Sequence, residues 1–292
     1  MKKLSVIAFA LLALLACNTK NEPAHSGSGS GSDTDTPAPT TVDGQLPGLF
    51  SVSPTKKVHF SQGNLQYQDS TNTWRFAENQ YDLVSRDNRY FVNVIPGWQD
   101  TYGWGTGNNP TLKSQEPSDY PTFIDWGSNP ISNGGNKPNL WRTLTNDEWQ
   151  YLFEGRPNAY DLYETTANIH DMTGLLLLPD DWTTPDSVVG SNIKNGIDIS
   201  PYIYYTDAEW AIMEAHGAVY LPAAAIFTNS GDYFMSYCYY WTSTPYDKDA
   251  NYAYNANAGS RSTNSGADEI SNDVEDGSIS YRHYTFFVRL VR

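Results

Sequence analysis

The segment Trp141-Arg142-Thr143-Leu144-Thr145-Asn146-Asp147-Glu148-Trp149 contains an unusually legible helix start. Thr145 stands at the N-cap and Glu148 follows three residues later, which is the spacing of a capping box: each side chain bonds the other residue's backbone N–H. The same pattern recurs in Thr206-Asp207-Ala208-Glu209-Trp210. The two segments therefore predict two helices. Capping also explains Glu148 and Glu209 better than a catalytic role does.

The rest of the chain favours short strands joined by long loops. Glycines at 155 and 217 are suitable helix stops. Apolar or aromatic runs predict strands at 175–179, 218–223, 239–243 and 286–291, and the turn-rich segment 64–77 predicts a hairpin. Tryptophans within the loops are expected to pin those loops to the core: Trp98, Trp104, Trp126 and Trp141. The expected class is α+β, with short antiparallel strands, two flanking helices and long loops.

Charge and composition exclude several classes of protein. The 292 residues carry a formal net charge of −15, which repels nucleic acid backbones, so no nucleic acid partner is expected. Aromatic residues make up 14% of the chain, which is too rich in large apolar side chains for disorder throughout. The two cysteines, Cys17 and Cys238, are too few for a disulfide framework.

The N-terminus has the pattern of a bacterial secretion signal. Two lysines precede an apolar run that ends in Leu14-Leu15-Ala16-Cys17. We expect residues 1–16 to be a signal peptide. Residues 17–44 are expected to comprise a lipidated (palmitate-bearing) Cys17 and a disordered Gly/Ser/Pro/Thr linker, and residues 45–292 to form one domain. Several acyl chains would hold the protein at a membrane, and the linker offers no other anchor. The alternative is an ordinary signal peptide with a chance cysteine.

Motifs spread over residues 50–292 resemble those of a known protein group. They are Asn64-Leu65-Gln66-Tyr67, Trp141 to Trp149, Leu178-Pro179-Asp180-x-Trp182, Tyr240-Trp241-Thr242-Ser243-Thr244-Pro245 and Val288-Arg289-Leu290-Val291-Arg292. The chain resembles surface lipoproteins of Bacteroides and Prevotella, of the Fibrobacter succinogenes major paralogous domain group. The resemblance implies a C-type lectin-like fold of the formylglycine-generating-enzyme branch, in which N- and C-terminal strands pair and long loops carry a binding surface. It also implies a surface-exposed lipid anchor in the cell outer membrane of a Bacteroidetes species.

The resemblance does not bring catalytic chemistry with it. The oxidases of that branch use paired cysteines, whereas this domain has Cys238 alone, which we expect to be buried and inert. The calcium-binding sugar motifs of animal C-type lectins do not occur in the sequence. We therefore expect no enzymatic activity, cofactor or metal site. A carboxylate-dependent enzyme using the pairs Asp180/Asp181 or Asp247/Asp249 is the alternative, because sequence does not supply the distance between carboxylates.

The candidate ligand-binding face lies in the segment after Trp241. Alternation predicts Tyr254, Ala256 and Ala258 on the inner side of a strand, with the amides of Asn255 and Asn257 outward. Tyrosine and asparagine together are typical of adaptable recognition surfaces. The candidate contacts with an extracellular protein or glycan are Trp241, Tyr246, Asp247, Asp249, Asn251, Tyr252, Asn255 and Asn257. The alternatives are an edge strand without a ligand, or a structural, pilus-associated role in assembly of the cell surface.

The same asparagine-rich segment resembles the C-terminal variable regions of diversity-generating retroelement targets. These systems change adenines, and asparagine codons then reach many other residues. The resemblance predicts a template repeat and a reverse transcriptase gene near the locus. Asparagine, serine and glycine also accumulate in ordinary loops, so a fixed sequence is the alternative.

Overall fold

The computed structural model describes residues 41–84, 97–225, 235–262, 268–271 and 278–292. The chain divides into two compact units, residues 1–35 and 36–292. The expected signal peptide, Cys17 and most of the expected linker lie outside the described residues. Among the described residues, no helix is both long enough and apolar enough to cross a membrane.

The two helices begin where the capping boxes predict. Helix α1 (Asn146–Gln150) starts after Thr145 and continues as a wider π-turn, η4 (Tyr151–Gly155), while α2 (Asp207–Ala215) starts after Thr206. Both reciprocal pairs of capping hydrogen bonds are formed, so the structural role expected for the two glutamates is confirmed. Gly217 follows α2 with a φ of 92°, a left-handed conformation that suits glycine.

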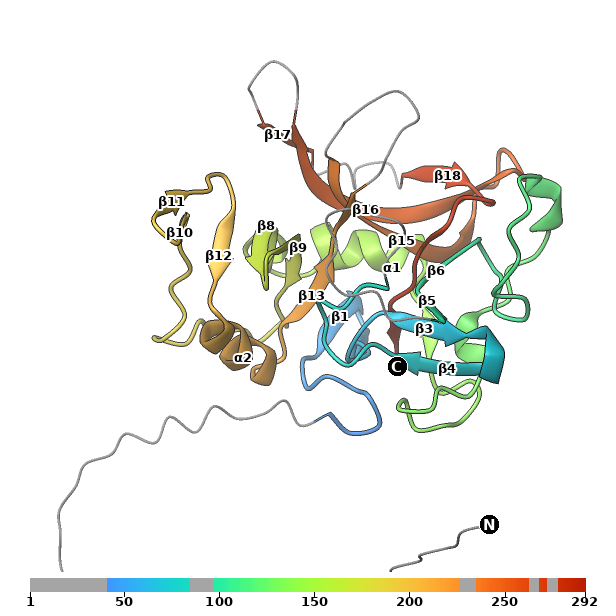
Figure 1. The fold of residues 1–292 in the computed structure, drawn as a ribbon, viewed down its shortest axis with the longest axis horizontal. Helices are drawn as coiled ribbons and strands as arrows, with labels where there is room; N and C mark the ends of the chain where they lie inside the picture. The colour runs from blue at the N-terminus through green and yellow to red at the C-terminus, as the bar shows by residue number, and fades with distance from the viewer. Residues whose placement is uncertain (1–40, 85–96, 226–234, 263–267, 272–277) are drawn as a thin grey trace, which may run out of the picture. The chain divides into compact units, whose positions relative to one another are not determined.

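Most of the described secondary structure is strand, which confirms a mixed α+β class (Figure 1). The largest sheet runs in the order β17 (Asp268–Ser271), β16 (Tyr252–Ser262), β15 (Met235–Pro245), β19 (Phe286–Phe287) and β6 (Thr101–Tyr102), with β14 (Ala224–Ala225) beside β15 and β18 (Ile279–Tyr281) beside β16. A four-stranded sheet has the order β12 (Ile203–Tyr205), β8 (Tyr163–Ile169), β9 (Met172–Leu177) and β13 (Val219–Pro222).

Smaller sheets complete the described strands. Three strands pair in the order β4 (Thr73–Phe76), β3 (Leu65–Gln68) and β5 (Trp98–Gln99); the pairs are β1 (Phe50–Ser53) with β2 (Lys56–Val58), β10 (Ile193–Lys194) with β11 (Ile197–Asp198), and β20 (Leu290–Val291) with β7 (Arg142–Thr143). Short 3₁₀ turns are η1 (Asp69–Thr71), η2 (Pro117–Asp119), η3 (Trp126–Ser128) and η5 (Ala159–Asp161). The pairing is antiparallel except between β12 and β8 and between β15 and β19.

The predicted strands occur, with adjusted ends. The hairpin in 64–77 is β3 and β4, and the two apolar runs before proline form β9 and β13, which pair with each other. The predicted strand 286–291 is split into β19 and β20, which pair with different partners.

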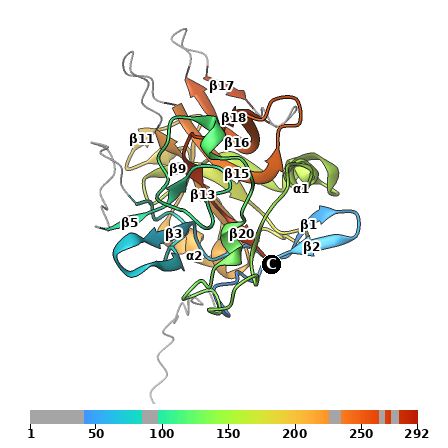
Figure 2. The ribbon, with the colours of Figure 1, turned by 90° about the vertical axis from the view of Figure 1, so that its right-hand side faces the viewer.

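The end of the chain closes the domain. Phe60 forms a bridge with Val291, and the backbone N–H of His59 donates to the carbonyl of Arg292 (2.9 Å). The C-terminus therefore lies beside β1 and β2, as Figure 2 shows.

An aromatic-rich core holds the loops. Trp104, Trp126 and Trp141 are buried in one cluster with β3, β4 and Trp241, so their predicted role is confirmed. Trp98 is half-buried and lies under the guanidinium of Arg75, 3.8 Å from the ring centroid. Loops pinned in this way supply a firm base for the strands of the largest sheet.

A candidate ligand-binding face

A ribbon of two strands, β16 and β18, carries aromatic side chains on one side. Tyr252 lies opposite Tyr281, and Tyr254 lies opposite Ile279. Because side chains alternate along a strand, these four share one side of the ribbon. The other side carries Ala253, which is fully buried in the aromatic cluster around Trp241. The ribbon therefore buries its small side chains and presents its rings.

These rings form one continuous cluster with neighbours from the adjoining turns. Centroid distances are 4.3 Å for Tyr252–Tyr281, 5.2 Å for Tyr281–His283 and 5.0 Å for His283–Tyr284. On the other flank, Tyr246 lies 6.5 Å from Tyr252 and 5.5 Å from Tyr254. We call this set the aromatic face; its members are Tyr246, Tyr252, Tyr254, Ile279, Tyr281, His283 and Tyr284.

The aromatic face reaches solvent. Tyr281 is 37% exposed and Tyr284 is 47% exposed, whereas Tyr240, Trp241 and Phe287 of the same sheet are buried. A side-chain hydrogen bond with Tyr281, followed by a smaller effect of desolvation, raises the pKa of Tyr252 to about 12. The phenol of Tyr252 therefore remains neutral at physiological pH and can serve as a hydrogen-bond donor or acceptor.

The loop before β16 is closed by its own hydrogen bonds. The backbone N–H of Tyr246 donates to the carbonyl of Tyr252 (3.2 Å), and that of Tyr252 donates to the carbonyl of Asp249 (3.1 Å). The Asp249 carboxylate accepts from the backbone N–H of Asn251 (2.9 Å). The loop thus holds Asp247, Lys248 and Asp249 exposed beside the aromatic face.

Arg282 fastens the ribbon from below. Its side chain is buried, with Nε donating to the carbonyl of Tyr252 (3.0 Å) and Nη1 to that of Tyr120 (3.1 Å). The guanidinium also lies 4.3 Å from the ring centroid of Trp104. Desolvation lowers the pKa of Arg282, although not enough to remove its charge. Arg282 directly follows β18, so a buried clamp stands next to the exposed ring of Tyr281.

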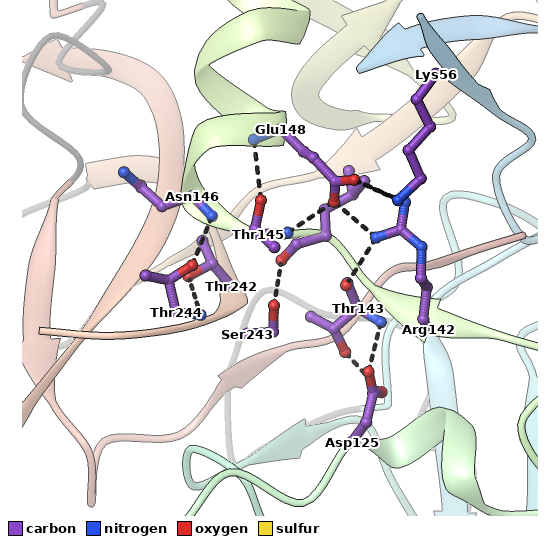
Figure 3. A network of polar contacts seen from close by, with 11 residues as sticks. Lys56, Asp125, Arg142, Thr143, Thr145, Asn146, Glu148, Thr242, Ser243 and Thr244 are labelled. Atoms are coloured by element: carbon purple, nitrogen blue, oxygen red, sulfur yellow. Dashed lines mark hydrogen bonds and ion pairs between the residues drawn. The ribbon is translucent and has the colours of Figure 1, made fainter. Parts of the chain in front are cut away.

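The end of β15 is tied to the start of α1, as Figure 3 shows. The hydroxyl of Thr244 accepts from the backbone N–H of Asn146 (3.0 Å), and the backbone N–H of Ser243 donates to the carbonyl of Leu144 (2.9 Å). The Thr242 hydroxyl accepts from the backbone N–H of Thr244 (3.1 Å) and donates to the carbonyl of Tyr254. These contacts fix the base from which the loop at 246–251 leaves.

Glu148 anchors the other side of this network (Figure 3). Its carboxylate accepts from both terminal nitrogens of Arg142 (2.6 and 2.9 Å), from Lys56 Nζ (2.9 Å) and from the backbone N–H of Thr145 (3.0 Å). Burial alone would raise the pKa of Glu148, but the hydrogen bonds from Arg142 and Lys56 outweigh it and lower the pKa. The carboxylate therefore has a structural role, joining α1 to β2 and β7.

Five of the eight candidate contacts lie at the aromatic face or on its adjoining loop: Tyr246, Asp247, Asp249, Asn251 and Tyr252. The other three, Trp241, Asn255 and Asn257, are buried. Trp241 is 1% exposed and donates its indole N–H to the carbonyl of Tyr102 (2.7 Å). These three side chains do not reach the surface, so they are left out of the candidate site.

The expected exposed row of amides is therefore not present. The Asn255 side chain is 1% exposed and donates through Nδ2 to the carbonyl of Ser278 (3.0 Å) and to the hydroxyl of Ser280 (3.1 Å). The physical reason is that this side of β16 packs on the aromatic core that buries Ala253, and the Asn255 amide is held there by Ser278 and Ser280. Tyr254 is half-exposed instead of inward, Ala256 is buried as expected, and the side chain of Ala258 lies outside the described set.

The second half of the aromatic face was not predicted from the sequence. Ile279, Tyr281, His283 and Tyr284 all come from the last fifteen residues. The run Tyr281-Arg282-His283-Tyr284 does indicate a concentration of aromatic rings. The pairing of Tyr281 with Tyr252, however, depends on sheet register, which local sequence does not specify.

The other chemistry-bearing residues have structural partners. Asp180 accepts from the hydroxyl and the backbone N–H of Ser51 and pairs with Lys57 (2.9 Å) and Arg156 (3.4 Å). Burial would raise its pKa, but these bonds outweigh burial and lower it. Cys238 is buried as expected, and desolvation raises its pKa to about 12, which disfavours the reactive thiolate. Within the described ranges, no three His, Cys, Asp or Glu side chains gather to hold a metal ion.

An open polar depression of about 510 Å³ lies elsewhere, near the first described residues. Its lining includes Gln62 and Asn133, whose side-chain nitrogens donate to the backbone carbonyls of Ala77 and Phe76. These two amides therefore hold the backbone of the hairpin end in place.

Comparison of the chain with protein-family models, with curated proteins and with solved structures found no match.

Proposed function

We propose that this protein is a surface-anchored lipoprotein that binds an extracellular ligand through the aromatic face. The supporting observation is that rings from two separate segments, 246–254 and 279–284, gather in one cluster, in which Tyr281 and Tyr284 are exposed and the other rings are half-buried. Contiguous exposed aromatic surface is uncommon on a soluble domain and marks interaction sites. Tyrosine provides large, stiff contact area together with a hydroxyl.

The proposed anchor and fold follow from the motifs. Cys17 would carry the lipid and hold the domain at the outer membrane, facing outward at the end of the linker. A C-type lectin-like fold is supported by the junction of the two ends of the domain, where His59 bonds Arg292, and by the two helices that accompany the sheets. In such a fold the loops and strand ends around β15, β16 and β18 would carry the binding surface.

We propose a binding role and no enzymatic one. The Asp180 carboxylate is hydrogen-bonded to Ser51 and paired with Lys57 and Arg156. The Glu148 carboxylate is paired with Arg142 and Lys56 and caps helix α1. Asp247 and Asp249 stand on an exposed loop, where water screens the interactions that tune a catalytic carboxylate. The aromatic face therefore supports recognition better than acid–base chemistry.

The test compares arrays of extracellular proteins and glycans probed with the full chain and with two variants. Tyr252→Ala with Tyr281→Ala removes the centre of the aromatic face. Tyr160→Ala removes a tyrosine that is 72% exposed on η5, outside the face, and serves as the matched control. We expect array signals that the double variant loses and the control keeps. Equal signals for both variants, with thermal unfolding unchanged, would refute the proposal.

A structural role in surface assembly is the second candidate, and one observation favours it. Val189, Ile193 and Ile197 are exposed around the β10–β11 pair, which provides a second apolar surface. A stoichiometric complex recovered from intact cells, lost on Ile193→Ser with Ile197→Ser and kept in the aromatic-face double variant, would favour assembly.

A further inference from the structure

The rings at the centre of the aromatic face are packed against one another. Tyr252 and Tyr281 are inclined by 30° at 4.3 Å, and Tyr281 and His283 by 26° at 5.2 Å. Near-parallel rings at these distances contact each other through their flat faces. Tyr246 and Tyr284 stand across the ends of this stack, at 78° to Tyr252 and 89° to His283. A sugar ring stacks on a flat aromatic face, so this arrangement suits a glycan poorly.

Tyrosine side chains suit a protein partner. The cluster brings several phenols together over the width of two strands, and tyrosines are enriched at the centre of protein recognition surfaces. Tyr252 and Tyr281 would lose little conformational freedom on binding, because the stacking of their rings and the hydrogen bond from Arg282 to the Tyr252 backbone already restrict them.

The charges around the face select the partner's chemistry. Asp247 and Asp249 are exposed on the adjoining loop, on either side of Lys248, so the loop carries one more negative than positive charge. The whole chain has a formal net charge of −15. Long-range attraction and local pairing therefore both favour a cationic ligand.

The face already accepts one cation. Lys248, from the adjoining loop, places its ammonium 5.9 Å from the ring centroid of Tyr246. A lysine or arginine of the partner could make the same cation–π contact with an electron-rich ring of the face. The Asp247 and Asp249 carboxylates follow Tyr246 in the sequence, on the same loop.

We propose that the ligand of the aromatic face is a protein segment bearing lysine or arginine side chains. This inference rests on the proposed function, because it names the ligand class of the same site.

The test uses short labelled peptides and neutral oligosaccharides as probes of the full chain. The peptides alternate glycine with lysine, arginine, serine or glutamate, and fluorescence polarisation reports binding at low and at physiological salt. We expect the lysine and arginine peptides to bind. Tyr281→Ala should weaken their affinity about tenfold, as truncation of a central interface tyrosine does. Asp247→Asn with Asp249→Asn should weaken them too, with a smaller salt dependence.

Matched variants separate site binding from general attraction to an acidic protein. Tyr160→Ala and Asp181→Asn change exposed residues outside the aromatic face and should leave the affinity unchanged. Equal loss in these controls, or no binding of basic peptides, overturns the inference. Oligosaccharide binding that depends on Tyr281 overturns the inference while the proposed function stands. Ligands found on the arrays that bind independently of Tyr252 and Tyr281 overturn both.

Discussion

Replacing Glu148 by alanine should destabilise the domain markedly, because one carboxylate joins three elements. It accepts two hydrogen bonds from Arg142 of β7, one from Lys56 of β2, and the capping bond from the backbone of Thr145 (Figure 3). The Glu148 side chain is 11% exposed, against 31% for Arg142 and 51% for Lys56. The two cations can therefore recover water when the carboxylate is removed.

The size of the effect follows from these contacts. The paired Arg142 bonds to a charged acceptor contribute about 1.5–3 kcal/mol. The half-exposed Lys56 pair adds no more than about 1 kcal/mol, and the capping bond adds about 0.5–1 kcal/mol. We expect Glu148→Ala to lower the free energy of unfolding by about 3 kcal/mol, which is a large part of the stability of a typical domain.

The assay is urea unfolding, followed by tryptophan fluorescence, of the wild type, Glu148→Ala and Glu209→Ala. Glu209 occupies the same capping position on α2 and accepts from the backbone N–H groups of Thr206, Val189 and Gly190. Its loss should cost about 1 kcal/mol, as for a helix cap. A cost for Glu148→Ala no larger than that of the control would refute the strength given to the ion pairs.

A pH series tests the charge directly. The folded-state pKa of Glu148 lies below its unfolded value of about 4.3. Its charge-dependent stabilisation is therefore fully present above that unfolded pKa and is lost as the pH falls through the folded-state pKa. The stability difference between wild type and Glu148→Ala should shrink on acidification through this range. A difference independent of pH would show that packing, and not charge, carries the effect.

Further outcomes are expected elsewhere in the chain. Trp241→Ala should cost about 3–5 kcal/mol in urea unfolding, because a fully buried indole is lost; a cost near zero would contradict its place in the core. Cys238 should resist thiol reagents in the folded protein at neutral pH and react after unfolding, and rapid labelling of the folded chain would contradict its burial. Cys17→Ser should release the protein from membranes, and retention would remove the lipoprotein proposal. Locus sequencing should find a template repeat matching the 3′ end, differing at template adenines, and a reverse transcriptase gene; a locus with neither removes programmed variation.

Local sequence by itself determined the helices and several strands. The Thr–x–x–Glu pairs at 145–148 and 206–209 specify helix starts because both capping bonds close within four residues. The hairpin at β3–β4 and the burial of Trp104, Trp126 and Trp141 likewise follow from turn residues and from the large apolar area of indoles.

Tertiary structure alone decided the aromatic face. Alternation correctly placed Tyr254 and Asn255 on opposite sides of β16, but it did not tell which of the two is buried. Asn255 is on the side that packs on the aromatic core, and its amide binds Ser278 and Ser280, more than twenty residues later in the chain; the pairing with β18 sets Tyr281 opposite Tyr252. Register between distant strands depends on contacts across the sheet, and a shift by one residue would exchange the two sides.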